Sequence, residues 1–246
     1  MVAYYAFTGS DGSFTLSNIT ELWRYKETFL ISFEYSIIAT LICILLGYPT
    51  AYILSRMKLR TQSAFMLLIM LPMWMNFLIR TYSWITILSN KGLINSLLVA
   101  LGFDTVQLIN TPGAVILGMV YNYLPYMILP IYSIMSKIDN SLLEAASDLG
   151  ASAFERLKRV ILPLSLPGVL SGITMVFVPS VSTFYISQKL GGGKTLLIGD
   201  AIEMQFQQSY NYNLGASLSL VLMVIILICI AVMNRFADNE DGGVLI

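Results

Sequence analysis

Side chains capable of acid–base or metal chemistry are scarce in this sequence. Its 246 residues include 14 Lys and Arg, 14 Asp and Glu, and no histidine, which excludes a histidine general base or metal ligand. The two cysteines, Cys43 and Cys229, each lie midway along an apolar run, as small packing residues do. We therefore predict no catalytic residue and no metal site, and the chemistry that remains is that of binding.

One apolar run is interrupted by a proline, several hydroxyl side chains and two aromatic rings. Polar, kinked backbone at membrane depth is tolerated where it lines a cavity, so this stretch is predicted to face a substrate path. Two tyrosines in an earlier run are added to the same path, although any single ring also fits an interfacial belt or simple packing. The predicted path residues are Tyr121, Tyr123, Ser180, Thr183, Phe184 and Tyr185.

Glu34 and Arg80 are the only charged residues well inside apolar runs. Ionisable residues at membrane depth usually face a partner, the bundle interior or water. With a rise of about 1.5 Å per residue, their positions in neighbouring runs allow a common depth near one surface. We predict a structural ion pair between them. The alternative is that Glu34 helps to admit a cation.

A polar, charged segment lies between two apolar runs and is typical of a docking element. It reads as two short helices joined by a tight turn at Gly150, where a left-handed residue commonly closes a helix. Ser141 with Glu144, and Ser152 with Glu155, match the capping-box spacing. The two prolines that follow, at 163 and 167, are expected to end the second helix.

The composition identifies the environment of the chain. Hydrophobic residues make up 57% of it, charged residues only 11%, and the mean hydropathy is +0.75, so it is an integral membrane protein. Zero net charge and the lack of a basic run argue against a nucleic-acid partner. Five runs are long enough to cross about 30 Å of hydrocarbon. They are residues 30–53, 64–88, 114–135, 168–187 and 216–233.

The basic residues set the orientation. Eight Lys and Arg, including tight clusters at 56–60 and 156–159, lie on one side of the predicted spans and five lie on the other. By the positive-inside rule, the segment around Gly150 is cytoplasmic. On the outer side, the amphipathic stretch 93–102 fits an interfacial helix or a gap filler. The polar stretch 188–214 fits either a docking surface for an external protein or a plain long loop.

The polar segment also carries a resemblance. Glu144-Ala145-Ala146, then Gly150, then Val160, Leu162 and Pro163 match the EAA pattern of permease subunits of ABC importers, with Val160 where isoleucine is usual. The resemblance implies an all-α, polytopic transmembrane bundle of the MetI-like permease fold. It also implies that this segment couples the permease to a cytoplasmic ATPase. The coupling residues it implies are Glu144, Ala145, Ala146, Gly150, Ala151, Leu162 and Pro163.

Four further motifs extend the resemblance over nearly the whole chain, to the first permease subunit of spermidine/putrescine importers. They are residues 46–49, 78–82, 91–95 and 196–199. The resemblance implies a bacterial plasma-membrane complex with a second EAA-type permease, an ATPase homodimer and an extracellular polyamine-binding protein. Aromatic faces and scattered carboxylates would suit such polycations. ATP and Mg²⁺ would bind the partner ATPase, and this chain would bind no cofactor.

The resemblance also implies six spans, whereas five are predicted here. With the first residues outside the cell, we expect a first span to be missing. The expected organisation is an extracellular segment 1–29, a transmembrane domain 30–237 with its coupling segment 139–167, and a cytoplasmic tail 238–246.

Other functions remain as alternatives. The chain fits a permease for sulfate, ferric iron or another small solute, and less well a non-transporting membrane scaffold. Gly193-Lys194-Thr195 imitates the end of a P-loop, but the position that requires the first glycine is Gln188, so we predict no nucleotide site. An intramembrane enzyme lacks any supporting residue arrangement.

Overall fold

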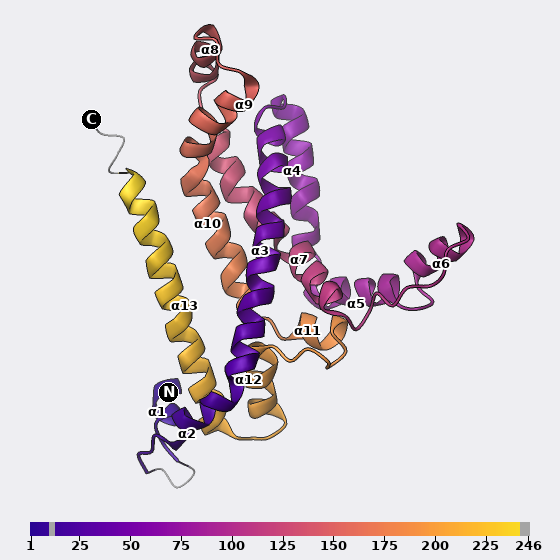
Figure 1. Cartoon of the computed structure of the whole chain (residues 1–246), viewed down its shortest axis with the longest axis vertical. Helices are drawn as coiled ribbons and strands as arrows, with labels where there is room; N and C mark the ends of the chain where they lie inside the picture. The colour runs from indigo at the N-terminus through magenta and orange to yellow at the C-terminus, as the bar shows by residue number, and fades with distance from the viewer. Residues whose placement is uncertain (10–12, 242–246) are drawn as a thin grey trace. The chain divides into compact units, whose positions relative to one another are not determined.

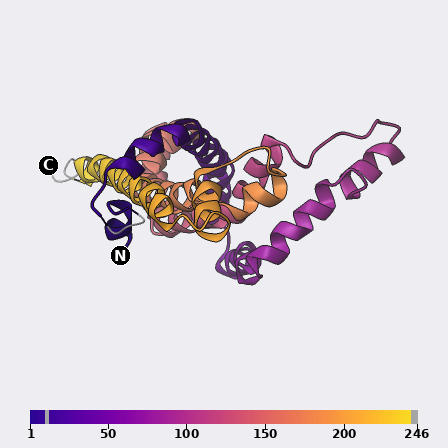
Figure 2. The same ribbon diagram turned by 90° about the horizontal axis from the view of Figure 1, so that it is seen from below.

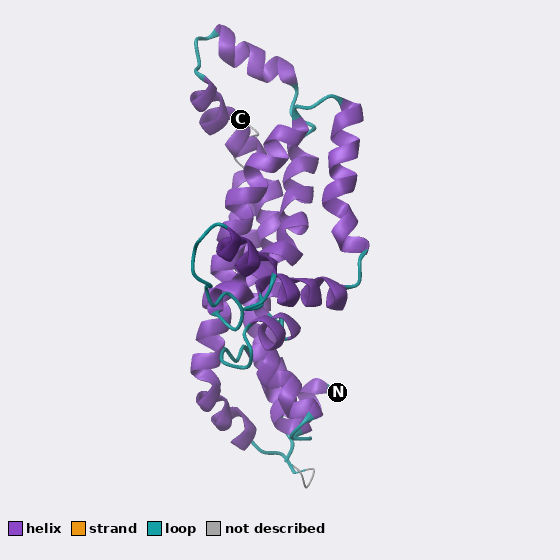
Figure 3. Cartoon of the chain, turned by 90° about the vertical axis from the view of Figure 1, so that its right-hand side faces the viewer, coloured by secondary structure: helices purple, strands orange, loops and turns teal. Residues whose placement is uncertain are grey.

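The computed structural model describes residues 1–9 and 13–241, and this part of the chain consists of helices and loops with one isolated β-bridge, Thr8 to Phe14 (Figures 1 and 3). The helices are α1 Val2–Ala6, α2 Ser17–Glu21, η1 Leu22–Tyr25, α3 Lys26–Ser55, α4 Leu59–Trp74, α5 Phe77–Leu88, α6 Leu93–Ala100, α7 Pro112–Met135, α8 Asn140–Asp148, α9 Ala153–Arg156, η2 Leu157–Ile161, α10 Leu162–Val181, α11 Tyr185–Leu190, α12 Ile198–Gln207 and α13 Tyr212–Asp241. The predicted all-α class is confirmed.

Four continuous helical segments are long and apolar enough to cross a membrane. They are Ser17–Ser55, Pro112–Met135, Ala153–Val181 and Tyr212–Met233. A fifth span is possible if α4 and the helical segment Phe77–Ala100, which contains α5 and α6, are counted together as one broken span. The first begins well before residue 30, so no break in the helix marks the expected boundary at 29. Of the predicted tail 238–246, residues 238–241 continue α13, and 242–246 lie outside the described residues.

The second predicted span, residues 64–88, is not one helix but a broken pair, because α4 ends at Trp74 and α5 begins at Phe77. The backbone is extended at Met75 and Asn76, and the Asn76 side chain accepts the Leu78 N–H at 2.8 Å to cap a new helix. Asparagine competes with the helix in this way because its short amide reaches its own backbone. Figure 2 shows α5 followed by α6 and the chain returning beside them.

The expectation that Pro163 and Pro167 end a helix is wrong. The helix that starts at Ala153 runs without a break through η2 and α10 to Val181. Proline normally removes a backbone bond and clashes with the carbonyl four residues earlier. Here the π-helical turn η2 directly precedes Pro163, and wider turns of this kind relieve such a clash.

The chain divides into two compact units. The first comprises 1–39, 76–121 and 177–230, and its core gathers Phe177, Val181, Ile198, Leu214 and Leu218. In this core the Ser32 hydroxyl accepts the Ile198 N–H at 2.7 Å.

The second unit comprises 40–75, 122–176 and 231–246, and small residues let its helices approach closely. A Cβ added at Gly168 would lie 2.9 Å from the Pro130 carbonyl oxygen, and one at Gly172 would lie 2.7 Å from the Met127 sulfur. The two glycines, four residues apart on α10, therefore allow close contact with α7.

Candidate functional site: the docking segment and an aromatic cluster

The docking segment begins at α8, but its first cap differs from the prediction. Asp139, not Ser141, caps the helix, and its carboxylate accepts the Ser141 N–H at 3.0 Å. Hydrogen bonds from the Ser141 backbone and hydroxyl lower the pKa of Asp139. The Ser141–Glu144 capping box is therefore wrong, because Asp139, two residues earlier, is an equally good cap and already satisfies the helix end. The second box is confirmed: the Glu155 carboxylate accepts the Ser152 N–H at 2.9 Å.

Gly150 closes α8 in the predicted left-handed conformation, with φ of +82°. The Gly150 N–H donates to the Ser147 carbonyl at 2.9 Å and the Ala151 N–H to the Ala146 carbonyl at 3.0 Å. This is the pattern of a Schellman turn, whose left-handed residue, here Gly150, is usually glycine because a Cβ is unfavourable in that conformation. Nothing lies within 4 Å of a Cβ built on Gly150, so the turn faces open space.

The turn presents apolar side chains that are largely exposed. Leu149 is 89% exposed and Phe154 71% exposed, on either side of Gly150. Glu144 is exposed as well and, in the described part of the chain, its carboxylate has neither a hydrogen bond nor an ion pair. We call Glu144, Leu149, Gly150 and Phe154 the docking ridge. Ala145 is exposed and Ala146 and Ala151 are half-buried, whereas Leu162 and Pro163 lie exposed beyond η2.

Two arginines hold the docking segment in place. Arg56 Nη1 donates to the Asn140 side-chain oxygen at 2.7 Å, and Arg156 Nη1 donates to the Ser147 hydroxyl at 2.6 Å. These contacts join α8 to the loop after α3 and to α9. The ridge is therefore an ordered surface and not a free loop.

Aromatic rings gather in the first unit, where α11 packs against α5. The Tyr185 ring lies 5.9 Å from Phe77 and 6.4 Å from Tyr82 between ring centroids. Lys189 Nζ lies over both tyrosine rings, 5.9 Å from the Tyr82 centroid and 5.7 Å from that of Tyr185. We call Phe77, Tyr82 and Tyr185 the aromatic cluster. Burial, and then the neighbouring Tyr82, raise the pKa of Tyr185.

The other predicted path residues lie apart from this cluster. Ser180 is fully buried and Thr183 is buried, so neither presents its hydroxyl to solvent. Phe184 is exposed just before α11 and takes part in no ring pair among the described residues. Tyr121 packs edge-on against Trp84, with centroids 5.3 Å apart. Tyr123, two residues further along α7, is half-buried.

Glu34 and Arg80 form no ion pair among the described residues, and this prediction is wrong. Glu34 is exposed, whereas Arg80 is only 8% exposed. The guanidinium lies over the Phe77 ring at 5.9 Å, and its Nε and Nη1 have no hydrogen-bond partner within the described chain. Because the second run breaks at Asn76, the common depth assumed for the two residues does not apply.

Asp200 is a buried carboxylate that no sequence pattern singles out. It is 2% exposed, its Oδ2 accepts the Leu197 N–H at 2.8 Å, and its Oδ1 has no partner in the described part of the chain. Burial raises the pKa of Asp200 to about 6, and hydrogen bonds from Leu197 and Ser187 oppose the shift. The residue fixes the start of α12, so stretch 188–214 is not a plain loop.

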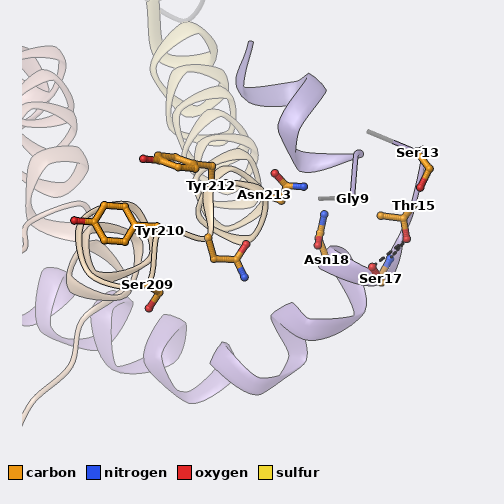
Figure 4. A pocket seen from close by; sticks show the side chains of 10 residues that line it. Gly9, Ser13, Thr15, Ser17, Asn18, Ser209, Tyr210, Tyr212 and Asn213 are labelled. Atoms are coloured by element: carbon orange, nitrogen blue, oxygen red, sulfur yellow. Dashed lines mark hydrogen bonds between the residues drawn. The ribbon is translucent and has the colours of Figure 1, made fainter. Parts of the chain in front are cut away.

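A cavity of about 800 Å³ opens between the first residues and the loop before α13, both within the first unit (Figure 4). Figure 4 shows Ser209, Tyr210 and Tyr212 on one side and Thr15 and Ser17 on the other. The lining side chains are hydroxyls, amides and tyrosines without a charge.

The sequence patterns did not point to Phe77 of the aromatic cluster or to Lys189, which lies over its tyrosine rings. Lys189 was used only to count charges, yet it follows Tyr185 by four residues, the spacing that places side chains on one helix face. Phe77 drew no attention because a continuous span through Met75 was expected.

The described residues form a multi-pass helical membrane domain with an exposed, polar docking segment, an arrangement typical of the membrane subunits of transporters. Residues 43–244 match the family described as binding-protein-dependent transport system inner membrane component. The chain belongs to this family, which makes it a multi-pass protein of the cytoplasmic membrane and a permease subunit of an ABC importer.

Two relatives are similar over most of the chain. The spermidine/putrescine transport system permease protein PotB of Haemophilus influenzae is 42% identical over 216 residues, covering 84% of this chain and 76% of that protein. PotB of Escherichia coli K12 is 44% identical over 197 residues, covering 78% and 72% respectively.

Solved structures agree on the fold. The chain matches a bacterial ABC transporter involved in import of the acidic polysaccharide alginate, with a TM-score of 0.77, 16% identity and coverage of 96% of this chain and 87% of that one. It also matches the MetNI methionine ABC transporter, with a TM-score of 0.65, 17% identity and coverage of 90% and 98%. These matches support the predicted MetI-like permease fold.

Proposed function

We propose that this chain is the permease subunit of an ATP-driven importer of spermidine and putrescine, and that it forms half of the translocation path. The observation that carries the proposal is the combination of 42–44% identity to PotB permeases with an exposed docking ridge at the matching EAA residues. A second EAA-type permease would supply the other half of the path.

The docking ridge is proposed to seat in a cytoplasmic ABC ATPase, present as a homodimer. Exposed apolar side chains rimmed by polar residues mark protein interaction sites, and Leu149 with Phe154 fits this description. Glu144 is not used as a helix cap, so its carboxylate is available to a partner. ATP and Mg²⁺ would bind that ATPase, and this chain would bind no cofactor.

The coupling would follow from helix continuity. Because α9, η2 and α10 form one helix, a displacement at Phe154 is transmitted along a rigid element to Val181. Thr183, Phe184 and Tyr185 follow directly. Rigid-body motion of this kind is the usual basis of alternating access.

The external partner is proposed to be a polyamine-binding protein. The stretch 188–214 and the polar cavity beside it lie one span away from the docking ridge along the chain, and therefore on the opposite side of the membrane. One of the similar alginate transporter structures is a complex with an alginate-bound periplasmic protein, which supports this arrangement in general terms.

ATP-dependent uptake of labelled spermidine and putrescine, by cells that express the complete transporter, tests the proposal. We expect uptake that unlabelled polyamines compete for and that excess sulfate leaves unchanged. Competition by sulfate alone would instead favour the anion permease alternative. Absence of any uptake, with all subunits assembled, would favour a scaffold.

A further inference from the structure

The Tyr82 and Tyr185 rings are already occupied by a cation of this chain. Tyr185 and Lys189 both lie on α11, one helical turn apart, while Tyr82 comes from α5 (Figure 1). The Lys189 ammonium lies 5.9 Å and 5.7 Å from the two ring centroids. Both distances are within the range of a favourable cation–π contact.

Lys189 has no acidic partner within the described chain. The Glu203 carboxylate on α12 accepts the Gln188 side-chain N–H at 2.9 Å. The charge of Lys189 is therefore balanced by the two rings and by solvent. An ammonium held in this way is easily exchanged, because no ion pair has to be broken.

The rings are arranged independently of Lys189. Phe77 packs on Tyr185 at 5.9 Å, and Tyr82 meets Tyr185 edge-on with an interplanar angle of 74°. Tyr82 is 52% exposed, so a solute can reach it. Arg80, by contrast, is buried over Phe77 and cannot swing away. The tyrosine pair is thus the one part of the aromatic cluster where a cation can be replaced.

We propose that Lys189 is a tethered competitor for a substrate ammonium subsite formed by Tyr82 and Tyr185. The inference rests on the proposed function, since it requires an organic ammonium substrate. An incoming ammonium group takes the place of Lys189 on the same two rings, and Lys189 turns into solvent. Lys189 therefore sets the apparent affinity of the permease for its substrate.

A purely structural role predicts the opposite effects. If Lys189 only fastens α11 to α5, its removal loosens the subsite, weakens substrate binding and lowers thermal stability. If Lys189 competes with substrate, its removal strengthens binding and leaves the fold unchanged.

The test compares Lys189→Met, which keeps the aliphatic stem without the charge, with Lys189→Arg, which keeps the cation. Lys194→Met, in the exposed loop that follows, is the matched control. Equilibrium binding of radiolabelled spermidine to the purified complete transporter, without ATP, is measured beside the KM and kcat of uptake.

We expect Lys189→Met to bind spermidine about two- to fivefold more tightly, the value of one exposed cation–π contact, with KM lowered to match. Lys189→Arg and Lys194→Met should resemble the wild type. The gain should vanish in a Lys189→Met, Tyr185→Leu double variant, because the subsite itself is then lost.

Unchanged or weaker binding by Lys189→Met would overturn the inference, as would binding by neither the wild type nor this variant. Spermidine binding that Lys189→Met strengthens, without any uptake by the wild type, would instead refute the proposed transport function and leave the subsite standing.

Discussion

At the scale of single residues, the acidic side chains divide into those used within the chain and those left free. Asp139 and Glu155 accept backbone hydrogen bonds as helix caps, and Asp200 is buried at the start of α12. Glu144 has no such intrachain role among the described residues, although the sequence pattern assigned it one. A carboxylate on an exposed ridge without a partner is what an intermolecular contact requires.

We expect Glu144→Lys to reduce ATP-driven uptake about tenfold, because charge reversal at an interface both removes an attraction and adds a repulsion. Membrane levels of the protein should not change, since Glu144 is exposed and has no hydrogen bond or ion pair among the described residues. Asp104→Lys, in an exposed loop of the first unit, makes the same change in net charge and serves as control. The measurement is the amount of ATPase that co-purifies with each variant. Recovery of the same amount of ATPase with Glu144→Lys as with Asp104→Lys would contradict the assignment of Glu144 to the ATPase contact.

Asp200 predicts a pH dependence of stability. Its pKa is raised from 3.8 to about 6 in the folded state, so the folded protein binds the proton more tightly than the unfolded chain. Stability therefore falls as the pH rises from about 4 to 6 and stays at the lower value above that.

Asp200→Asn should abolish this slope and raise stability at neutral pH by roughly 1–3 kcal/mol, because the amide keeps an acceptor for Leu197 without the buried charge. Thermal unfolding midpoints of the purified protein at pH 4.5 and pH 7.5 provide the check. A variant that is less stable than the wild type at both pH values would show that ionised Asp200 is needed.

At the scale of elements, sequence patterns predicted the turns and caps that are decided by neighbouring residues. The left-handed turn at Gly150, the Ser152 cap and the contact of Gly168 follow from residue type and spacing. Patterns failed where a distant or alternative contact decided the outcome. Pro163 continues a helix because the preceding π-turn accommodates it, and the second run breaks because the Asn76 side chain caps a new helix.

In the candidate site, too, features set by neighbouring residues could be predicted and features set by distant contacts could not. The position of the docking ridge could be predicted because its residues lie within one short segment, 144–154, although Leu149 and Phe154 were not singled out. The aromatic cluster could not, because it depends on packing of α11 against α5 across about a hundred residues of chain. Glu34 and Arg80 were paired on the assumption of an unbroken second span, and that assumption failed.

The turn itself can be tested by a graded substitution. Gly150→Val forces a β-branched residue into φ of +82°, which costs about 1–3 kcal/mol locally and should unwind the end of α8. We expect the variant to reach the membrane but to lose the ATPase and most uptake. Gly150→Asn, which tolerates the left-handed region, should retain most of both. Full uptake by the valine variant, with the ATPase still bound, would rule out a role for the turn.

At the scale of the whole molecule, the proposed coupling to an ATPase depends on one continuous helix. The ridge enters a helix of 29 residues, Ala153–Val181, without a break. That helix ends where the residues proposed to meet the substrate begin. A permease driven by an external ATPase needs such a continuous connection, and the central claim is that the ridge is its cytoplasmic end.

Site-directed labelling of Leu149→Cys with a membrane-impermeant maleimide, in a chain whose Cys43 and Cys229 are replaced by alanine, tests this claim most directly. Tyr210→Cys, exposed before α13, is the control for the opposite face. We predict that Leu149→Cys is labelled only in inside-out vesicles and is protected when the ATPase is bound, while Tyr210→Cys is labelled in intact cells. Labelling of Leu149→Cys from outside the cell would contradict the account.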